Sequence, residues 1–275
     1  MLKLGDAGPS VLEAQELLNR NGAILDADGS FGNSTENAVR EFQAAAAPSL
    51  QVSGVIDEAT WQALRALPEP SPDIPVRAVA FIGRAEVGSR ELYDKIVCRP
   101  IWPGGASGVT IGVGYDLGQE SSFEADWSGV LTPEQLAALR PWLQVRGQAA
   151  AGGPAQLKNL TIPWHAAWQV FIRRSLPDQV HATSRAFVGW EAMPRLCFGM
   201  LVSLVYNRGA RMNDSAGVPG DRTEMRAIRD AVAAGRFADI PAQLRSMERL
   251  WPVGSGLRDR REREAKLFEA GLAQT

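Results

Sequence analysis

The sequence is poor in cysteine and histidine, since its 275 residues include only two of each. The two cysteines, Cys98 and Cys197, are too few for a disulfide framework, and we expect free thiols. The two histidines, His165 and His181, make a three-ligand zinc site difficult and disfavour an imidazole-based triad. By elimination, carboxylates are the favoured acid–base groups, and we expect neither a metal nor an organic cofactor.

Long apolar runs are also missing. No stretch of about 18 apolar residues occurs, as a membrane span would need. The first ten residues, "MLKLGDAGPS", lack the charged segment and apolar core of a secretory signal. We therefore expect a chain without a membrane span or a general export signal. With 45% hydrophobic and 22% charged residues, the composition is that of a globular protein, and its length favours two domains.

The charge is small but unevenly distributed. The net charge is −2, yet residues 1–70 hold 4 basic and 10 acidic residues, whereas the rest holds 25 basic and 21 acidic ones. A mildly basic second part suits an anionic polymer such as a cell wall, although chance drift explains so small a difference equally well. We expect no nucleic-acid partner, and we expect a monomer.

A proline-rich stretch divides the chain. The nine residues 67–75, "LPEPSPDIP", contain four prolines, each of which fixes φ and removes a backbone donor. This composition predicts a stiff, extended linker. We therefore predict a first domain at residues 1–67, a linker at 68–75 and a second domain at 76–275.

The first domain reads as three short helices. The first has helically spaced apolar residues and ends at Gly22, a usual C-terminal glycine. The second covers "NSTENAVREFQAA", with Ser34 or Thr35 as its N-cap. The third follows Asp57 as its cap and turns Trp61 inward. Three short helices bury little area, so we expect this domain to be only marginally stable alone.

These segments resemble the peptidoglycan-binding module that accompanies many wall-degrading enzymes. The resemblance covers essentially all of residues 1–66 and includes the core "DGSFGNSTENAVREFQ", Asp28 to Gln43, and the closing pair Thr60-Trp61. It implies bacterial peptidoglycan as the partner. Taken singly, the turn and apolar residues of this pattern are more typical of structure than of ligand contact.

The second domain opens with a helix that carries a candidate acid. Val79, Ile82 and Glu86 follow helical spacing, so a helix that buries the two apolar residues also turns Glu86 inward at its last turn, before Gly88. Partial desolvation would raise the pKa of this carboxyl and make it a usable general acid. A surface glutamate beside an arginine fits the spacing equally well.

A glycine-rich stretch, "GGASGVTIGVGYDLGQE" at residues 104–120, follows. In an extended chain Thr110 and Asp116 share one face with Gly112 and Gly114. These glycines permit a bend or hairpin that would bring Thr110 and Asp116 to one cleft and leave room for a polymer. From the residues alone, a plain glycine-rich hairpin is the stronger interpretation.

Glu86 in "AEVG" and the later "TIGVG" resemble the phage-type lysozymes, and the closer match is to pesticin-like muramidases. In the latter the catalytic aspartate follows the threonine by six positions, which is the place of Asp116. The resemblance implies catalytic roles for Glu86, Thr110 and Asp116 in hydrolysing the β-1,4 bond between N-acetylmuramic acid and N-acetylglucosamine. In phage-type lysozymes the aspartate precedes the strand, and Asp94 is therefore the competing second carboxylate.

The remaining landmarks follow in the order expected for these lysozymes. "MLVSLVYNRGARMND" resembles their central helix and "GLRDRREREAKLF" their last one. We assign substrate binding to Tyr115 and to Asn207, whose amide at a helix end can hold an N-acetyl group. By spacing alone, the run around Arg260 and Arg261 predicts a solvated helix face.

Two further helices are expected between these landmarks. Each has a threonine cap, Thr132 before Pro133 in one and Thr161 before Pro163 in the other. The predicted fold class is therefore mainly α (α+β): a small three-helix peptidoglycan-binding domain linked to a lysozyme-like domain with a small β-region.

Together these features predict a modular phage endolysin with muramidase activity. The alternatives are a lytic transglycosylase, a chitinase or chitosanase of the same superfamily, and a non-catalytic wall-binding protein. Without a signal peptide, the chain is expected to be made in the host cytoplasm and to act in the periplasm or cell wall after release. A secreted antibacterial effector is the other possible setting.

Overall fold

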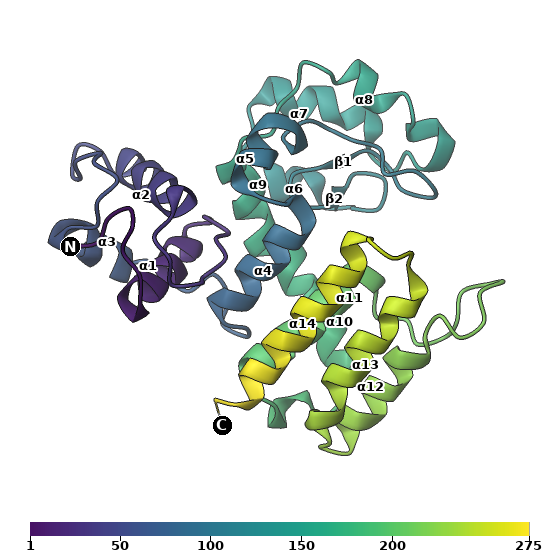
Figure 1. The fold of residues 1–275 in the computed structure, drawn as a ribbon. Helices are drawn as coiled ribbons and strands as arrows, with labels where there is room; N and C mark the ends of the chain where they lie inside the picture. The colour runs from purple at the N-terminus through teal and green to yellow at the C-terminus, as the bar shows by residue number, and fades with distance from the viewer. Residues whose placement is uncertain (275) are drawn as a thin grey trace. The chain divides into compact units, whose positions relative to one another are not determined.

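The computed structural model describes residues 1–274, which form a mainly α fold with a single two-stranded sheet (Figure 1). This confirms the predicted mainly α class with a small β-region. The chain divides into two compact units, of which the first comprises Met1–Pro70 and Gly83–Leu176. The second comprises Ser71–Ile82 and the described residues from Pro177 onward. The predicted boundaries around a linker at 68–75 stay a prediction.

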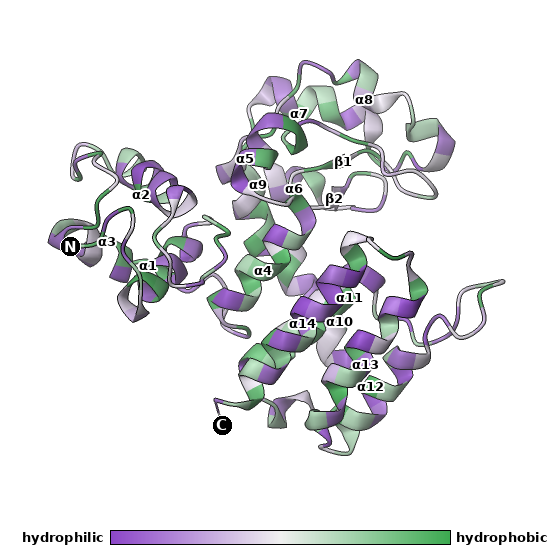
Figure 2. Cartoon of the chain, viewed as in Figure 1, coloured by the Kyte–Doolittle hydropathy of each residue, from purple (hydrophilic) through white to green (hydrophobic). Residues whose placement is uncertain are grey.

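Three helices form the N-terminal part of the first unit, as the sequence predicts. They are α1 (Pro9–Arg20), α2 (Asn33–Ala45) and α3 (Glu58–Arg65), and α1 contacts both of the others. Hydrophobic and hydrophilic residues alternate along α1 and α2 in Figure 2, so each helix turns an apolar face inward. The shared core is built mainly from Val11, Leu18, Phe31, Val39, Phe42, Ile56, Trp61 and Leu64.

The helix caps agree with the sequence prediction in one case and differ in another. Asp57 caps α3, because its Oδ1 accepts a hydrogen bond of 2.8 Å from the backbone N–H of Thr60. The predicted cap of α2 is wrong: Gly32 is the N-cap and no side chain takes part. Thr35 has a different role, since its buried hydroxyl accepts a hydrogen bond from Gln15 Nε2 at 3.1 Å.

Two buried glutamines hold the loops of this part in the same way. Gln15 Oε1 accepts a hydrogen bond of 2.8 Å from the backbone N–H of Gly29, and Gln43 Oε1 accepts one of 2.9 Å from that of Gly54. Each amide nitrogen also donates to the threonine hydroxyl in the helix that follows, at 3.1 Å in both cases. The buried amides are thus satisfied and fix the two loops on the helices.

The rest of the first unit contains short helical segments and the hairpin. The α-helices are α5 (Arg90–Leu92), α6 (Phe123–Trp127), α7 (Pro133–Leu139), α8 (Gly153–Gln156) and α9 (Trp164–Val170). The π-helical and 3-10 turns are η1 (Tyr93–Val97), η2 (Arg140–Trp142), η3 (Gly147–Ala150) and η4 (Phe171–Ser175). The strands are β1 (Thr110–Ile111) and β2 (Tyr115–Asp116).

The two predicted threonine caps have different outcomes. Thr132 caps α7 in a full capping box with Gln135, which confirms the prediction. Thr161 does not cap α9, because the helix begins later and Pro163 is its N-cap without a side-chain bond.

The three-helix part and residues 83–176 share buried contacts. Trp164 Nε1 donates a hydrogen bond of 2.9 Å to the carbonyl oxygen of Gly22. Gly22 has a φ of +84°, and a Cβ atom there would lie 2.9 Å from the ring of Trp168. Glycine is therefore required at this joint both by its backbone angle and by the space available.

The second unit is helical. It holds most of α10 (Leu176–Ala186) and of α4 (Val76–Val87), then η5 (Trp190–Ala192), α11 (Arg195–Arg208), α12 (Thr223–Ala233), η6 (Phe237–Asp239), α13 (Ile240–Ser246), η7 (Met247–Leu250) and α14 (Gly256–Leu272). α14 packs against both α11 and α13. α11 is buried along most of its length, which fits its nearly unbroken apolar sequence.

A buried ionic network joins α11 to α14 and corrects one prediction. Arg260 and Arg261 do not lie on a solvated face, since their side chains are 7% and 0% exposed. Both pair with Glu264 Oε1, at 3.2 and 2.9 Å, and Ser203 donates to the same oxygen at 2.6 Å. Spacing of charges along one helix cannot reveal the serine on the neighbouring helix.

Both cysteines are free thiols, as expected, and the structure shows that both are buried. Within residues 1–274, none of the helices combines the length and the apolar content that crossing a membrane requires.

Candidate active site

Glu86 lies in the last turn of α4, which ends at Val87. Gly88 follows with a φ of +82°, a backbone conformation suited to the end of a helix, and this confirms the predicted stop. Val79 and Ile82 on the same helix are fully buried, while Glu86 is half-buried. Glu86 is therefore carried by a helix that is anchored in the core, and its side chain remains partly exposed.

The glycine-rich stretch forms an antiparallel hairpin. Thr110 pairs with Asp116, and Ile111 pairs with Tyr115. The turn between the strands needs left-handed backbone angles, with φ of +58° at Gly112 and +74° at Gly114. The predicted bend therefore exists, and it makes Thr110 and Asp116 direct cross-strand neighbours.

The pairing between these two residues is of the close kind. Thr110 exchanges both of its backbone hydrogen bonds with Ile101 on the other side, at 2.8 and 3.0 Å. The neighbouring ladder bond runs from the N–H of Leu117 to the carbonyl of Val109, at 2.9 Å. Thr110 and Asp116 thus form a non-hydrogen-bonded pair, for which Cβ atoms are typically about 4.5–5.5 Å apart. A hydroxyl and a carboxylate then stand together on one face.

The Asp116 carboxylate is held by three donors. Its Oδ1 accepts hydrogen bonds from the backbone N–H groups of Gly108, at 2.9 Å, and Gly118, at 2.8 Å. Its Oδ2 accepts one of 2.6 Å from the side-chain amide of Gln119. A Cβ at position 108 would lie 2.6 Å from Oδ1, so glycine is needed there. Gln119 is exposed, and Asp116 is half-buried.

Gln119 is a contact that the sequence reasoning missed. Its position three residues after Asp116 is the signal that could have indicated it, since an amide at that spacing can return to the aspartate across a turn.

Tyr115 lies on the opposite face of the hairpin from Asp116 and is only 2% exposed. Its hydroxyl donates a hydrogen bond of 2.7 Å to Asp126 Oδ2, and its ring packs edge-on against Trp127. Burial, reinforced by the bond to Asp126, raises the pKa of the Tyr115 hydroxyl. These are contacts of a core residue, and none of them supports the predicted binding of substrate, which stays a prediction.

Asn207 is the penultimate residue of α11 and is half-buried. Within residues 1–274 its Oδ1 is buried and has no hydrogen-bond partner. Burying an amide oxygen without a hydrogen-bond donor costs free energy. A ligand that supplies an N–H group would offset this cost. Asn207 belongs to the second unit, whereas Glu86, Thr110 and Asp116 belong to the first.

Asp94, the competing carboxylate, is exposed and lies in η1. Its Oδ1 accepts a hydrogen bond of 3.1 Å from Arg90, four residues earlier. Asp94 also lines a pocket together with α2, which belongs to the three-helix part. Its hydrogen-bond donor therefore differs from those of Asp116.

No group of three or more histidine, cysteine, aspartate or glutamate side chains suited to a metal ion occurs among residues 1–274.

Comparison with known proteins gives one family assignment. Residues 7–64 match the peptidoglycan binding domain family. No curated protein matches the chain. Among solved structures, the crystal structure of the Burkholderia AP3 phage endolysin is similar at 18% sequence identity, covering 98% of this chain and 99% of that one, with a TM-score of 0.23. At this TM-score the likeness carries no argument. The family match gives the chain a peptidoglycan binding domain at residues 7–64, and this domain supports peptidoglycan as a partner.

Proposed function

We propose that the chain is a peptidoglycan hydrolase of the muramidase type, which cleaves the β-1,4 bond between N-acetylmuramic acid and N-acetylglucosamine. The N-terminal binding domain supports the substrate, because it directs the chain to peptidoglycan. The sequence pattern of Glu86, "TIGVG" and Asp116, which resembles pesticin-like muramidases, supports the reaction.

One observation carries the proposal: the hairpin register that makes Thr110 the direct partner of Asp116. A hydroxyl and a carboxylate on adjacent strands can bind one water between them, the first as donor and acceptor and the second as acceptor. A glycosidase needs such a water on the side of the sugar opposite its acid. The hairpin fixes both groups on a short, tightly bonded ribbon, so the water would be oriented without further movement.

In the mechanism that follows, Glu86 is protonated and donates its proton to the glycosidic oxygen as the bond breaks. Asp116 accepts a proton from the water, which Thr110 helps to orient, and the water oxygen bonds to the anomeric carbon. An inverting enzyme keeps its two carboxyl groups about 6.5–9.5 Å apart to accommodate this water. The reaction requires neither a metal ion nor an organic cofactor.

Asn207 has a binding role in this proposal. Its buried Oδ1 has no partner among residues 1–274 and can accept a hydrogen bond from the N–H of an N-acetyl group. Tyr115 supports the site indirectly, since its buried ring and its bond to Asp126 hold β2 against the core.

The experiment is digestion of purified sacculi with the full-length protein, followed by mass analysis of the released muropeptides. Reducing N-acetylmuramic acid ends are the expected product. Reducing N-acetylglucosamine ends, or free peptides with intact glycan, would reject the muramidase assignment.

A lytic transglycosylase is the second candidate, and one observation favours it. The Asp116 carboxylate accepts hydrogen bonds from Gly108, Gly118 and Gln119, which is a structural use of this group. A transglycosylase needs one glutamate and no second carboxylate, and it releases anhydro-sugar ends. The same mass analysis separates the two, because anhydro products lack one water.

The biological setting that we infer is that of a phage endolysin acting as a monomer. The protein would be made in the host cytoplasm and would reach the wall after release, and a secreted effector is the other setting. A chain without any hydrolytic activity on sacculi would instead be a wall-binding protein.

A further inference from the structure

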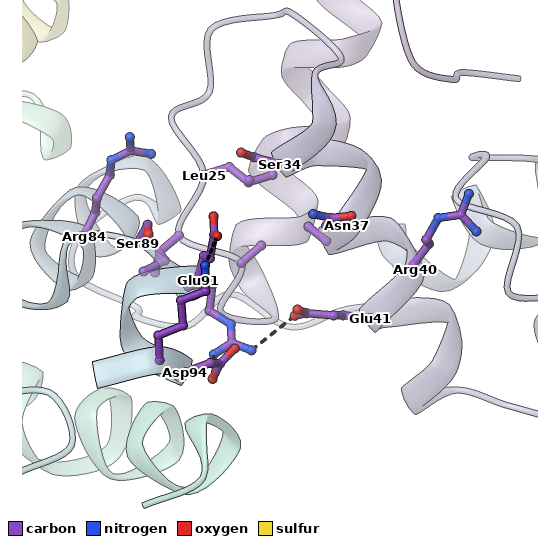
Figure 3. Close-up of a pocket in the computed structure, with 14 residues that line it drawn as sticks. Leu25, Ser34, Asn37, Arg40, Glu41, Arg84, Ser89, Glu91 and Asp94 are labelled. Carbon is purple, nitrogen blue, oxygen red and sulfur yellow. Dashed lines mark hydrogen bonds and ion pairs between the residues drawn. The ribbon is translucent and has the colours of Figure 1, made fainter. Parts of the chain in front are cut away.

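A pocket of about 450 Å³ lies in the first unit, and the hairpin contributes nothing to it (Figure 3). One wall comes from residues 23–25 and from the face of α2 that carries Ser34 and Asn37. The other wall comes from the end of α4, from α5 and from η1. A pocket of about 300–1,000 Å³ is typical of sites for small ligands. Only the first wall belongs to the matched domain at residues 7–64, so neither wall forms the pocket alone.

Arg90 forms ion pairs with both walls of the pocket. Its Nη2 lies 3.3 Å from Glu41 Oε2 on α2, and its Nη1 lies 3.1 Å from Asp94 Oδ1 on η1. The guanidinium stacks on the ring of Trp164, 4.8 Å from its centroid, and the Arg90 side chain is only 19% exposed. The Arg90 guanidinium therefore contacts a carboxylate on each wall and an aromatic ring.

Arg84 adds a positive charge to the pocket wall. It lines the pocket from α4, and within residues 1–274 it makes no hydrogen bond or ion pair. It has an electrostatic effect on Asp28, whose pKa is lowered mainly by the backbone N–H of Ser30 and to a smaller extent by Arg84. A guanidinium at a pocket wall suits a carboxylate, which it can bind through two parallel hydrogen bonds.

An acidic group and an apolar surface complete the pocket. Glu91 is 76% exposed, and its carboxylate points into the space between Ser89 and Leu25 in Figure 3. Its pKa is lowered by the hydrogen bond from Lys95, so at neutral pH the group is an anion that can also attract an ammonium. The side chains at positions 23, 24, 25 and 38 are alanine, isoleucine, leucine and alanine, a surface suited to methyl groups.

The apolar wall includes a strained residue. Ile24 has a φ of +47°, a left-handed conformation that a β-branched side chain rarely adopts, and it is 2% exposed. Such strain persists where the surroundings impose it, and it is concentrated at ligand sites. Gly83 on α4 makes room for this side chain, because a Cβ there would lie 3.2 Å from Ile24 Cγ2.

We propose that this pocket binds the stem peptide of peptidoglycan in its uncross-linked form. Such a peptide carries free carboxylates, alanine methyl groups and, on its diamino acid, a free ammonium. A carboxylate would pair with Arg84, the ammonium with Glu91, and the methyl groups would cover the apolar wall. The inference rests on peptidoglycan as the substrate of the proposed function and adds the part of the polymer that is recognised.

The test is isothermal titration of the full-length protein with the free tetrapeptide L-Ala–γ-D-Glu–meso-diaminopimelate–D-Ala. Arg84→Gln is expected to weaken binding by roughly tenfold or more, because a charge-assisted bidentate pair is lost. Arg77→Gln is the matched control, since it removes an arginine from the same helix at a position that does not line the pocket. Equal affinity of Arg84→Gln and the unchanged protein would overturn the proposal, and so would equal losses in the two variants.

A second pair of measurements tests the proposed contact between the peptide ammonium and Glu91, whose side chain is exposed. Glu91→Gln is expected to weaken binding of the free tetrapeptide and to leave binding of the amine-acetylated tetrapeptide unchanged. The same loss for both peptides, or no binding of the free tetrapeptide to the unchanged protein, would reject the site. The titration measures binding and the digestion of sacculi measures cleavage. Absence of peptide binding would therefore reject the pocket proposal alone, and absence of cleavage would reject the proposed function alone.

Discussion

Thr110 and Asp116 are direct cross-strand partners in the β1–β2 hairpin, with their side chains on one face. Their sequence separation of six residues would place them about 20 Å apart in an extended chain. The left-handed backbone angles of Gly112 and Gly114 let the chain reverse, so that Thr110 and Asp116 lie opposite each other on paired strands. The glycines therefore determine whether the hydroxyl and the carboxylate can lie side by side.

The first prediction separates the two candidate carboxylates. Asp116→Asn should reduce the rate of sacculus digestion by roughly a hundredfold or more, as expected when a general base is removed. Asp94→Asn, the control, should stay within about threefold, since it alters a surface pair of little energetic weight with Arg90. Asparagine retains an oxygen that can accept from Gly108 and Gly118, so the melting temperature of Asp116→Asn should remain close to that of the unchanged protein. The reverse order of activities would assign the role to Asp94.

The second prediction concerns the binding domain. Removal of residues 1–67 should lower the rate on intact sacculi more than the rate on short soluble glycan chains, because only the polymer benefits from being held near the catalytic site. The measurement compares the two rates at one enzyme concentration. Equal losses on both substrates would contradict a targeting role.

The same truncation should also affect stability. Without residues 1–67 the indole N–H of Trp164 loses its acceptor at Gly22, and the face of Trp168 against Gly22 becomes exposed. We expect a lower melting temperature for the remaining chain, measured by circular dichroism. An unchanged melting temperature would show that these contacts contribute nothing to folding. The comparison of the two substrates should be made below the melting temperature of the truncated chain.

Much of the local structure could be predicted from the sequence, because local rules decide it. The cap at Asp57, the capping box at Thr132 and the helix stop at Gly88 follow from short-range hydrogen bonds and glycine angles. The prediction of Thr35 as a cap was wrong, because its hydroxyl accepts a hydrogen bond from Gln15, which is 20 residues away in the sequence.

The less predictable features depend on contacts between distant segments. The charge pattern around Arg261 indicated a solvated face, and only the packing of α14 against α11 buries it. The pocket walls at Leu25 and Arg84 come from segments separated by about sixty residues, so no sequence window contains both. The cross-strand pair of Thr110 and Asp116 was predictable because its glycines lie between the two residues.

The third prediction tests the buried network. Glu264→Ala leaves Arg260 and Arg261 buried without their shared carboxylate, and should lower the free energy of unfolding by about 3–5 kcal/mol. Glu262→Gln on the same helix, which is paired with Arg245 nearer the surface, should cost about 0–1 kcal/mol. Urea denaturation measures both values, and similar costs for the two variants would contradict a buried role for Glu264.

The fourth prediction is a pH dependence in the loop before α12. The backbone N–H of Gly220 and the Arg226 guanidinium hold the pKa of Asp214 at about 2, below its ordinary 3.8. A depressed pKa stabilises the fold above pH 3.8, and this contribution is lost as the pH falls from 3.8 towards 2. Asp214→Asn should therefore be less stable than the unchanged protein at pH 7, and the difference should shrink through this window. A difference that stays constant down to pH 2 would exclude the ionised carboxylate as its cause.

The most direct test of the account is the rate at which Glu86→Gln releases soluble fragments from purified sacculi. Glutamine keeps the shape of the side chain and cannot donate the proton that the leaving oxygen needs, so we predict a loss of roughly a hundredfold or more. Glu191→Gln, at an exposed glutamate in η5 to which no role is assigned, is the matched control and should retain glycan cleavage. If Glu86→Gln released fragments at more than about a tenth of the normal rate, the general acid would lie elsewhere.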